Sequence, residues 1–197
     1  MSNQPRVKIT QDQLLDDNQA SWAFNWFEKN VPWQQDVYNF SGHKVKAPRL
    51  TALYGVDYQY SGLDKKAIPL DQVLSKLLGL VQSKADEYLL GGVDKVANFN
   101  SILLNYYRDG KDCIGAHSDD EPALGDSPIV ASLSLGATRR MVFNSKHSDV
   151  ECYITLEHGD YLIMHQGMQE DWTHSIPRVF STLPRISLTF RTIKENI

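Results

Sequence analysis

The sequence is poor in cysteine, because its 197 residues include only Cys113 and Cys152. Two cysteines make no disulfide framework, and a reducing cytosol is then the default compartment. The sequence also lacks a run of about 18 apolar residues, as a membrane-spanning helix would need. The first residues, MSNQPRVKIT, have no apolar core of a secretory signal. We therefore expect a soluble monomer of the cytoplasm, or of the nucleus in a eukaryote, with no membrane partner.

An excess of basic charge is missing as well. The formal net charge is −4, whereas a protein that coats duplex nucleic acid is usually basic. A local cluster can override the total, and the segment HKVKAPR at 43–49 carries lysines and an arginine without an acid. Lys65 and Lys66 form a smaller basic spot. Each cluster can also be an ordinary solvated face, so composition counts only mildly against nucleic acid.

Repeats, low-complexity tracts and long linkers are absent too, which favours a single domain over residues 1–197. A hydrophobic content of 42% and a charged fraction of 22% are typical of a globular chain with a sizeable core. Within the domain we distinguish an N-terminal extension, 1–47, from a sheet-rich core, 96–193.

Helical spacing dominates the first half of the chain. Trp22 and Trp26 lie four residues apart within 19–30, which predicts a short amphipathic helix. A longer apolar stripe runs from Pro69 to Leu90 and predicts a second helix, ended by the glycines at 91–92.

From Val96 onward the pattern predicts strands separated by turn signals such as RDGKD and HGD. The expected strands lie within residues 98–107, 127–137, 139–144, 151–157, 160–165 and 185–193. Helices ahead of many strands predict an α+β fold, a double-sheet jelly roll with the N-terminal helices packed on one sheet. A different α+β sandwich is the alternative.

The stretch IGAHSDDE, residues 114–121, combines a histidine with three acids. If residues 115–119 are extended, His117 and Asp119 point the same way, about 6.6 Å apart. Both could then hold one ion, as in the two-histidine, one-carboxylate triad of non-haem iron(II) oxygenases. The alternative is a solvated acidic turn.

A second histidine would complete such a triad, and four candidates follow Asp119. His147 and His158 lie in expected turns, whereas His165 and His174 bracket the loop QGMQEDWT. We favour His174, because it begins the run toward the last strand, and keep His165 as the alternative.

That last strand, RISLTFR, places two arginines on one polar face. Arg185, Ser187, Thr189 and Arg191 alternate with Ile186, Leu188 and Phe190. A ligand with a carboxylate at each end would pair with both arginines. Alternatively, the arginines reach solvent or pair with Asp119, Asp120 or Glu121. Upstream, Asn105 and Tyr107 share strand parity and offer polar groups to the same ligand or to cross-strand packing.

The set Asn105-x-Tyr107, His117-x-Asp119, His174 and Arg185-x-x-x-Thr189-x-Arg191 closely resembles the AlkB family of iron(II)- and 2-oxoglutarate-dependent dioxygenases. The resemblance runs from about Pro48 to Ile193 and is closest to the branch that acts on alkylated bases; residues 1–47 match poorly. It implies a double-stranded β-helix fold, and O2 as the oxidant.

The resemblance also implies roles for single residues. His117, Asp119 and His174 match the iron ligands, and Arg185 matches the partner of the distal carboxylate of 2-oxoglutarate. Further contacts to this co-substrate are implied for the rest of the polar set: Asn105, Tyr107, Thr189 and Arg191.

Substrate contacts are implied in two places. Residues 48–62 resemble the nucleotide-recognition lid, where Tyr58 and Tyr60 line the pocket of an extruded base. Asp120 and Glu121 match positions near the base edge. Phe40, at an expected turn, could be a wedge inserted into a duplex or a packed aromatic residue.

The expected activity is oxidative dealkylation of bases such as N1-methyladenine and N3-methylcytosine in DNA, with release of an aldehyde. The same chemistry on RNA, a protein or a small molecule is the first alternative. A non-catalytic nucleic-acid-binding domain of the same fold is the second.

Overall fold

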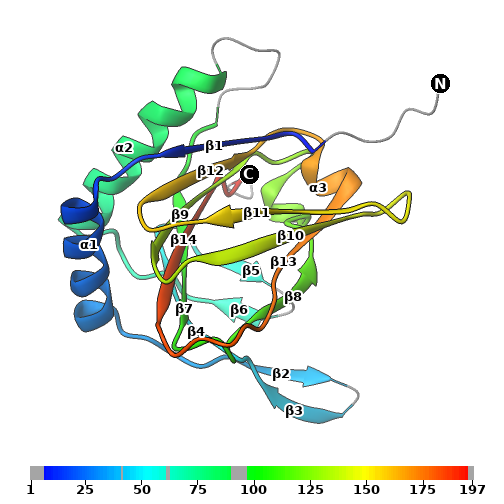
Figure 1. The fold of residues 1–197 in the computed structure, drawn as a ribbon, viewed down its shortest axis with the longest axis horizontal. Coiled ribbons are helices and arrows are strands. Elements are labelled where there is room, and N and C mark those ends of the chain that lie inside the picture. Colours follow the sequence, from blue (N-terminus) through cyan, green and yellow to red (C-terminus); the bar gives the residue numbers. More distant parts are fainter. Residues whose placement is uncertain (1–6, 41, 61–62, 90–96, 195–197) are drawn as a thin grey trace.

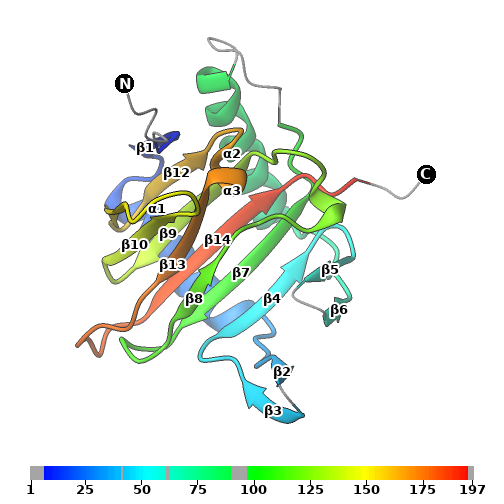
Figure 2. The same cartoon turned by 90° about the vertical axis from the view of Figure 1, so that its right-hand side faces the viewer.

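A computed structural model of the protein describes residues 7–40, 42–60, 63–89 and 97–194 (Figure 1). Two antiparallel sheets face one another, a six-stranded one and a four-stranded one (Figure 2). Side chains from both sheets meet in a shared apolar cluster that includes Tyr107, Phe143 and Trp172. This arrangement confirms the predicted jelly roll.

The larger sheet comprises, in spatial order, β1 (Ile9–Gln13), β12 (Asp160–Met164), β9 (Val130–Gly136), β14 (Arg185–Arg191), β7 (Ser101–Tyr107) and β4 (Leu50–Tyr54). The smaller sheet comprises β11 (Glu151–Leu156), β10 (Arg139–Ser145), β13 (Trp172–Ile176) and β8 (Ile114–His117). Two separate hairpins are formed by β2 (Val37–Phe40) with β3 (His43–Lys46), and by β5 (Tyr58–Tyr60) with β6 (Leu63–Lys65).

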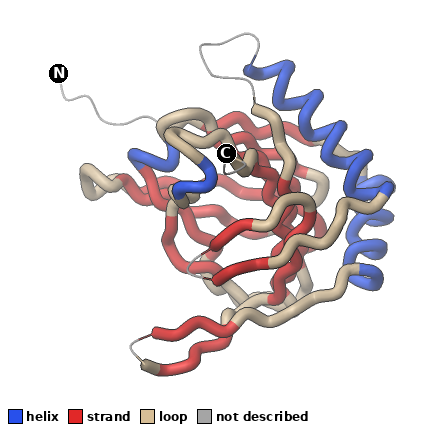
Figure 3. Tube along the Cα trace, turned by 180° about the vertical axis from the view of Figure 1, so that it is seen from behind, coloured by secondary structure: helices blue, strands red, loops and turns tan. Residues whose placement is uncertain are grey.

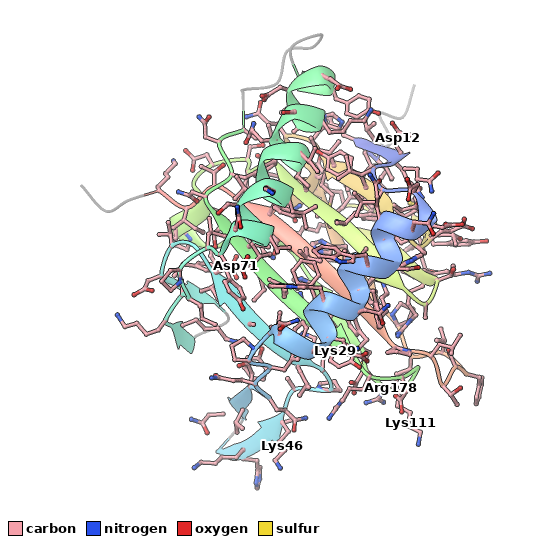
Figure 4. The ribbon with its side chains drawn as sticks, turned by 90° about the vertical axis from the view of Figure 1, so that its left-hand side faces the viewer. Asp12, Lys29, Lys46, Asp71, Lys111 and Arg178 are labelled. Carbon is pink, nitrogen blue, oxygen red and sulfur yellow. The ribbon has the colours of Figure 1, made fainter. Side chains whose placement is uncertain are left out.

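Two helices, α1 (Asp17–Asn30) and α2 (Gln72–Leu89), cover the outer face of the larger sheet (Figures 3 and 4). α1 begins two residues before the predicted start, because Asp16 and Gln19 form a reciprocal capping box. α2 begins at Gln72 rather than Pro69, since the Asp71 carboxylate accepts the Leu74 N–H at 2.8 Å. The glycines at 91–92, predicted to end this helix, lie outside the described residues. Neither helix is long and apolar enough to cross a membrane.

β14 shows why the site lies between the sheets. Ile186, Leu188 and Phe190 pack into the cluster beneath the helices, whereas Arg185 and Arg191 point to the opposite face, toward the smaller sheet. This is the alternation that the sequence predicts. The polar face of β14 is therefore enclosed by the jelly roll, where water is largely excluded.

The first half of the chain differs from the prediction. It holds six strands, β1 to β6, where only helices were expected. β1, which lies within the predicted N-terminal extension, adds an edge strand to the larger sheet by pairing with β12. The segment 48–62, predicted as a lid, is divided between an edge strand of the larger sheet, β4, and the β5–β6 hairpin.

Candidate metal centre and anion pocket

Strand pairing brings the two histidines together. β13 pairs with β8 so that His174 lies opposite His117, and their ring centroids are 4.3 Å apart. On its other side β13 pairs with β10, where Phe143 lies opposite His174 and covers it. The geometry of the smaller sheet therefore supports the choice of His174 over the other histidines as the second histidine of the group.

Asp119 joins the histidines from just beyond the strand. β8 ends at His117, so the expected extended run through residue 119 is not formed. One oxygen of Asp119 nevertheless lies 4.0 Å from His117 Nε2. One ligand atom from each of His117, Asp119 and His174 lies within 4.8 Å of the others. The acidic stretch is thus part of a compact three-ligand group rather than only a solvated turn.

The Asp119 carboxylate is fully buried beside positive charge. Burial opposes its ionisation, but Arg191, His174 and His117 together outweigh burial, so the pKa of Asp119 falls to about 2. Oδ1 accepts a hydrogen bond from Arg191 at 2.7 Å. Oδ2 is buried and has no hydrogen-bond partner in the described part of the chain. An ionised, half-satisfied carboxylate beside two imidazoles is a suitable ligand for a dication.

His174 is in the form that a metal requires, and His117 is oriented toward the same position. Burial and the neighbouring His117 lower the pKa of His174 to about 3, so His174 is neutral at pH 7. His117 Nδ1 lies 2.9 Å from the Gly115 carbonyl oxygen. When Nδ1 donates to this carbonyl, the lone pair of Nε2 is free for an ion, which is the usual outer contact of a metal-binding histidine.

The inner face of the larger sheet forms a polar cavity next to this group. β14 pairs with β7 so that Ser187 lies opposite Asn105 and Arg185 opposite Tyr107. The cavity is lined by Leu103, Asn105, Tyr107, Ile114, His117, Ser132, Met141, Met164, His174, Ile176, Ser187, Thr189 and Arg191. Asn105, Tyr107, Thr189 and Arg191 therefore line one cavity together with two of the candidate metal ligands, His117 and His174.

Arg185 lies on the same strand face, beside Tyr107, with its guanidinium carbon 5.3 Å from the ring centroid. It is 1% exposed, and burial lowers its pKa to about 10. Nη2 donates to Ser134 Oγ at 2.8 Å. Nε and Nη1 find no acceptor among the residues that the structure describes. Buried guanidinium donors without acceptors indicate a site for an anion.

Arg191 partly fits the alternative interpretation, in which the arginines of β14 pair with nearby acidic residues. It pairs with Asp119, as that reading proposed, and this pairing raises its pKa against the effect of burial. Its Nε and Nη1 remain without acceptors within the described ranges. One arginine beside the metal group and one farther along the strand fit a ligand with two carboxylates.

Two buried arginines were missed as such by the sequence reading. Arg49 was grouped with an exposed basic run, yet it is 4% exposed and donates to Asn105 Oδ1 at 2.9 Å. Arg139 is 2% exposed and donates to the carbonyl oxygens of Asp112 and Pro177. No spacing signal distinguishes these arginines from surface ones, because their partners come from distant segments.

Two of the residues predicted to contact a base, Tyr58 and Glu121, interact electrostatically with the cavity residue Arg191. Tyr58 is 5% exposed and packs with Leu53 and Leu103. Asp120 is exposed and lies 3.7 Å from Lys146 Nζ. Glu121 is half-buried, and burial together with Asp119 raises its pKa. The side chains of Tyr60 and Phe40 lie outside what the structure describes, so their roles stay predictions.

The other histidines have separate partners. His165 Nε2 lies 2.8 Å from Thr10 Oγ1, and His158 Nδ1 accepts the Gly136 N–H. His147 contacts Asp171 at the surface. Within the described ranges, the group of His117, Asp119 and His174 is the one cluster of such side chains close enough to hold an ion.

Comparison with known proteins agrees with this geometry. The model of the 2OG-Fe(II) oxygenase superfamily matches residues 9–191, which extends the similarity well before Pro48. The chain is 37% identical to alpha-ketoglutarate-dependent dioxygenase alkB homolog 3 of Mus musculus over 191 residues, covering 91% of this chain and 64% of that protein. It is 34% identical to DNA oxidative demethylase ALKBH2 of Mus musculus over 181 residues, covering 81% of this chain and 72% of that protein.

The chain thus spans about two thirds of the length of the alkB homolog 3 proteins that it matches. Among solved structures, OsALKBH1 superposes with a TM-score of 0.63 at 18% identity, covering 96% of this chain and all of that one. At this identity the likeness concerns the fold, which is the jelly roll described above.

Proposed function

Because the chain belongs to the 2OG-Fe(II) oxygenase superfamily, as a member of its AlkB family, we propose that it removes alkyl groups oxidatively from ring nitrogens of bases in DNA. The observation that carries the proposal is the juxtaposition of the three-ligand group with two buried arginines of β14: Arg191, which lines the polar cavity, and Arg185, which lies beside the cavity residue Tyr107. Relatives with this chemistry are named as a DNA oxidative demethylase and as alkB homologues, which supports a nucleic-acid substrate.

His117, Asp119 and His174 would hold iron(II), and their side chains fit it: two imidazoles and one ionised carboxylate with an oxygen that has no hydrogen-bond partner among the described residues. When bound, iron(II) and 2-oxoglutarate supply a reaction with O2 in which 2-oxoglutarate becomes succinate and carbon dioxide, and one oxygen atom is inserted into a C–H bond of the alkyl group. A hydroxyalkyl group on a ring nitrogen then leaves as an aldehyde, and the nitrogen recovers its proton or lone pair.

The protein's own residues bind and orient the reactants. Arg185 would pair with the distal carboxylate of 2-oxoglutarate, since its free donors lie in a buried site where such pairs are strong. Arg191 lies beside Asp119 and would pair with the carboxylate nearer the metal. Asn105 is held by Arg49, which keeps its amide N–H groups directed to the cavity. The enclosing sheets exclude water from the reacting atoms.

We assign the substrate contacts to the β5–β6 hairpin and to residues 120–121. Tyr58 and Tyr60 on the β5–β6 hairpin would line the pocket for an extruded base, and Asp120 and Glu121 would accept hydrogen bonds from its edge. Strand β3 is exposed along its length and carries Lys44 and Lys46. Lys46, Lys111 and Arg178 lie toward one end of the molecule (Figure 4). These cations would pair with phosphates despite the net negative charge.

Formaldehyde release from matched oligonucleotides tests the proposal. The substrates are single- and double-stranded DNA and RNA, each with one N1-methyladenine, incubated with iron(II), 2-oxoglutarate and air. We expect release from DNA with the wild-type protein and none with His117→Ala. The variant His147→Ala, at an exposed turn, is the matched control and should retain activity. Release from RNA alone would move the substrate to RNA, and turnover by His117→Ala would contradict the metal assignment.

A further inference from the structure

The position of Asp119 raises a question about its support. Strand pairing fixes His117 and His174, but Asp119 lies beyond the end of β8 and has no strand partner. Its carboxylate must nevertheless stay within a few tenths of an ångström of a ligand position to hold a metal. Other contacts must therefore hold this segment of backbone.

Those contacts come from one short segment, α3 (Met168–Asp171) and the residue after it. Ser118 Oγ donates to the Trp172 carbonyl oxygen at 2.9 Å. The backbone N–H of Asp119 donates to Gln169 Oε1 at 2.9 Å. Lys146 Nζ donates to the Gln169 carbonyl oxygen at 2.8 Å and lies 3.7 Å from Asp120. Three consecutive residues, 118–120, are thus connected to the same segment.

Gln169 is the central member of this set. Its side chain is buried, with 2% of the residue exposed. Its Oε1 accepts the Asp119 N–H, and its Nε2 lies 3.5 Å from Met164 Sδ, at the wall of the cavity. The amide is therefore locked from both ends. A buried N–H needs an acceptor, and Gln169 Oε1 supplies one to Asp119.

We propose that Gln169 is a positioning residue, which orients the Asp119 carboxylate for metal binding by holding the Asp119 backbone. It touches neither the metal position nor the substrate, and it acts through Asp119. The inference rests on the proposed metal centre but not on the identity of the alkylated substrate. Outer contacts of this kind typically change metal affinity about 10–100-fold when removed.

The test is a titration with manganese(II), followed by electron paramagnetic resonance, in the absence of nucleic acid and 2-oxoglutarate. Gln169→Met keeps the side-chain length but removes the acceptor, and we expect its manganese affinity to fall about 10–100-fold. Gln169→Glu keeps an acceptor oxygen and should stay near the wild-type affinity. His117→Ala marks the loss of the site.

Gln82→Met is the matched control. Gln82 Oε1 accepts the Phe99 backbone N–H at 3.0 Å, the same kind of contact on helix α2, where it faces a different segment. This variant should lower the melting temperature but leave manganese affinity unchanged. If Gln169→Met does not fold, Gln169→Asn, whose oxygen lies one methylene short of the Asp119 N–H, replaces it in the comparison.

Unchanged affinity in Gln169→Met, or in Gln169→Asn where that variant replaces it, would overturn the proposal, and so would an equal loss in Gln82→Met. Loss in Gln169→Glu as large as in His117→Ala would also overturn it, because the acceptor would then be irrelevant. A wild-type protein without His117-dependent manganese binding would overturn both the metal centre and the role of Gln169. A protein that binds manganese as expected but dealkylates no oligonucleotide would leave this inference intact and remove only the proposed substrate.

Discussion

The two carboxylate oxygens of Asp119 have different surroundings. One carboxylate oxygen pairs with Arg191, and the other is buried without a protein partner among the described residues. A dication bound at the second oxygen would help Arg191 to neutralise the negative charge of the Asp119 carboxylate. The remaining donors of Arg191, Nε and Nη1, would be available to a carboxylate of 2-oxoglutarate. The ion pair between Asp119 and Arg191 therefore keeps a buried negative charge at the position for the metal and a buried positive charge at the position for 2-oxoglutarate, before either of them binds.

Arg185→Met should weaken the binding of 2-oxoglutarate to the manganese-loaded protein. A hydrogen bond to a charged group contributes about 1.5–3 kcal/mol, which corresponds to a loss of roughly 10–150-fold in affinity. Isothermal titration calorimetry measures it. Arg140→Met is the control, because Arg140 is exposed and stacks on Tyr153 with its guanidinium carbon 4.4 Å from the ring centroid. Equal affinities for Arg185→Met and Arg140→Met would contradict the assignment of Arg185.

The residues of the site differ in how far the sequence predicts them. His117, Asp119 and His174 are recognisable because few side-chain types bind iron and their spacing matches a family. The alternation of β14 places Arg185 and Arg191 together, since strand periodicity is a local property. Gln169 and Arg49 carry no such signal, because each acquires its role from a partner more than 45 residues away, at separations of 50 and 56. Only the folded chain shows that these polar side chains are buried.

At the scale of elements, the two hairpins are linked by a buried ion pair. Lys65 on β6 lies 2.6 Å from Asp36, the residue before β2, and the two side chains are 13% and 8% exposed. Thr51 on β4 connects both, since its hydroxyl donates to Asp36 at 2.9 Å and accepts from Lys65 at 2.6 Å. This network joins the β5–β6 hairpin, which carries Tyr58, to the edge of the larger sheet. It therefore fixes the expected base-binding hairpin against β4.

Lys65→Gln should loosen the β5–β6 hairpin. Removing one partner of a buried pair leaves the other charge uncompensated, at a cost of a few kcal/mol in buried settings. Amide hydrogen exchange of Tyr58–Tyr60 and Leu63–Lys65 should then accelerate by about tenfold or more, since about 1.4 kcal/mol corresponds to a factor of ten. Lys66→Gln is the neighbouring control, because Lys66 is 93% exposed in its pair with Asp57. Equal exchange rates in both variants would show that the buried pair does not hold the hairpin.

The elements that the sequence predicts well are those with a strong apolar pattern. β7, β9, β12 and β14 each lie between two packed layers and carry apolar side chains on their buried faces. β3, in contrast, is exposed throughout, and β1 reads ITQDQ, so neither carries the alternation that marks a strand. They form because partner strands offer backbone hydrogen bonds. Their missing apolar pattern explains why the first half of the chain was predicted as helices alone.

Across the described residues, two large apolar clusters lie on opposite faces of the larger sheet, and a smaller third one contains Tyr58. One cluster lies under α1 and α2, and the other lies between the sheets. The candidate site belongs to the second, where polar side chains interrupt the apolar packing. Buried charges such as Arg185 destabilise the ligand-free fold, so ligands that satisfy them should stabilise it.

Manganese(II) and 2-oxoglutarate together should raise the melting temperature. At about 100 times the dissociation constant, a ligand stabilises a protein by about 2.7 kcal/mol, and for a chain of this size that corresponds to a shift of about 5–10 °C. Differential scanning fluorimetry measures the shift. His117→Ala should show little of it, whereas His147→Ala, at an exposed contact with Asp171, should show it in full. An equal shift in both variants would place the ligands elsewhere.

The most direct test of coupled dealkylation is the ratio of succinate to formaldehyde when excess protein with iron(II) and 2-oxoglutarate meets a limiting amount of an N1-methyladenine DNA oligonucleotide in air. One oxygen atom of O2 enters succinate and the other enters the methyl group, so we predict equal amounts of both products above the background without oligonucleotide. His117→Ala should yield neither. Succinate that does not increase with the methylated oligonucleotide, in a protein that binds iron and 2-oxoglutarate, would contradict coupled oxidation of the base.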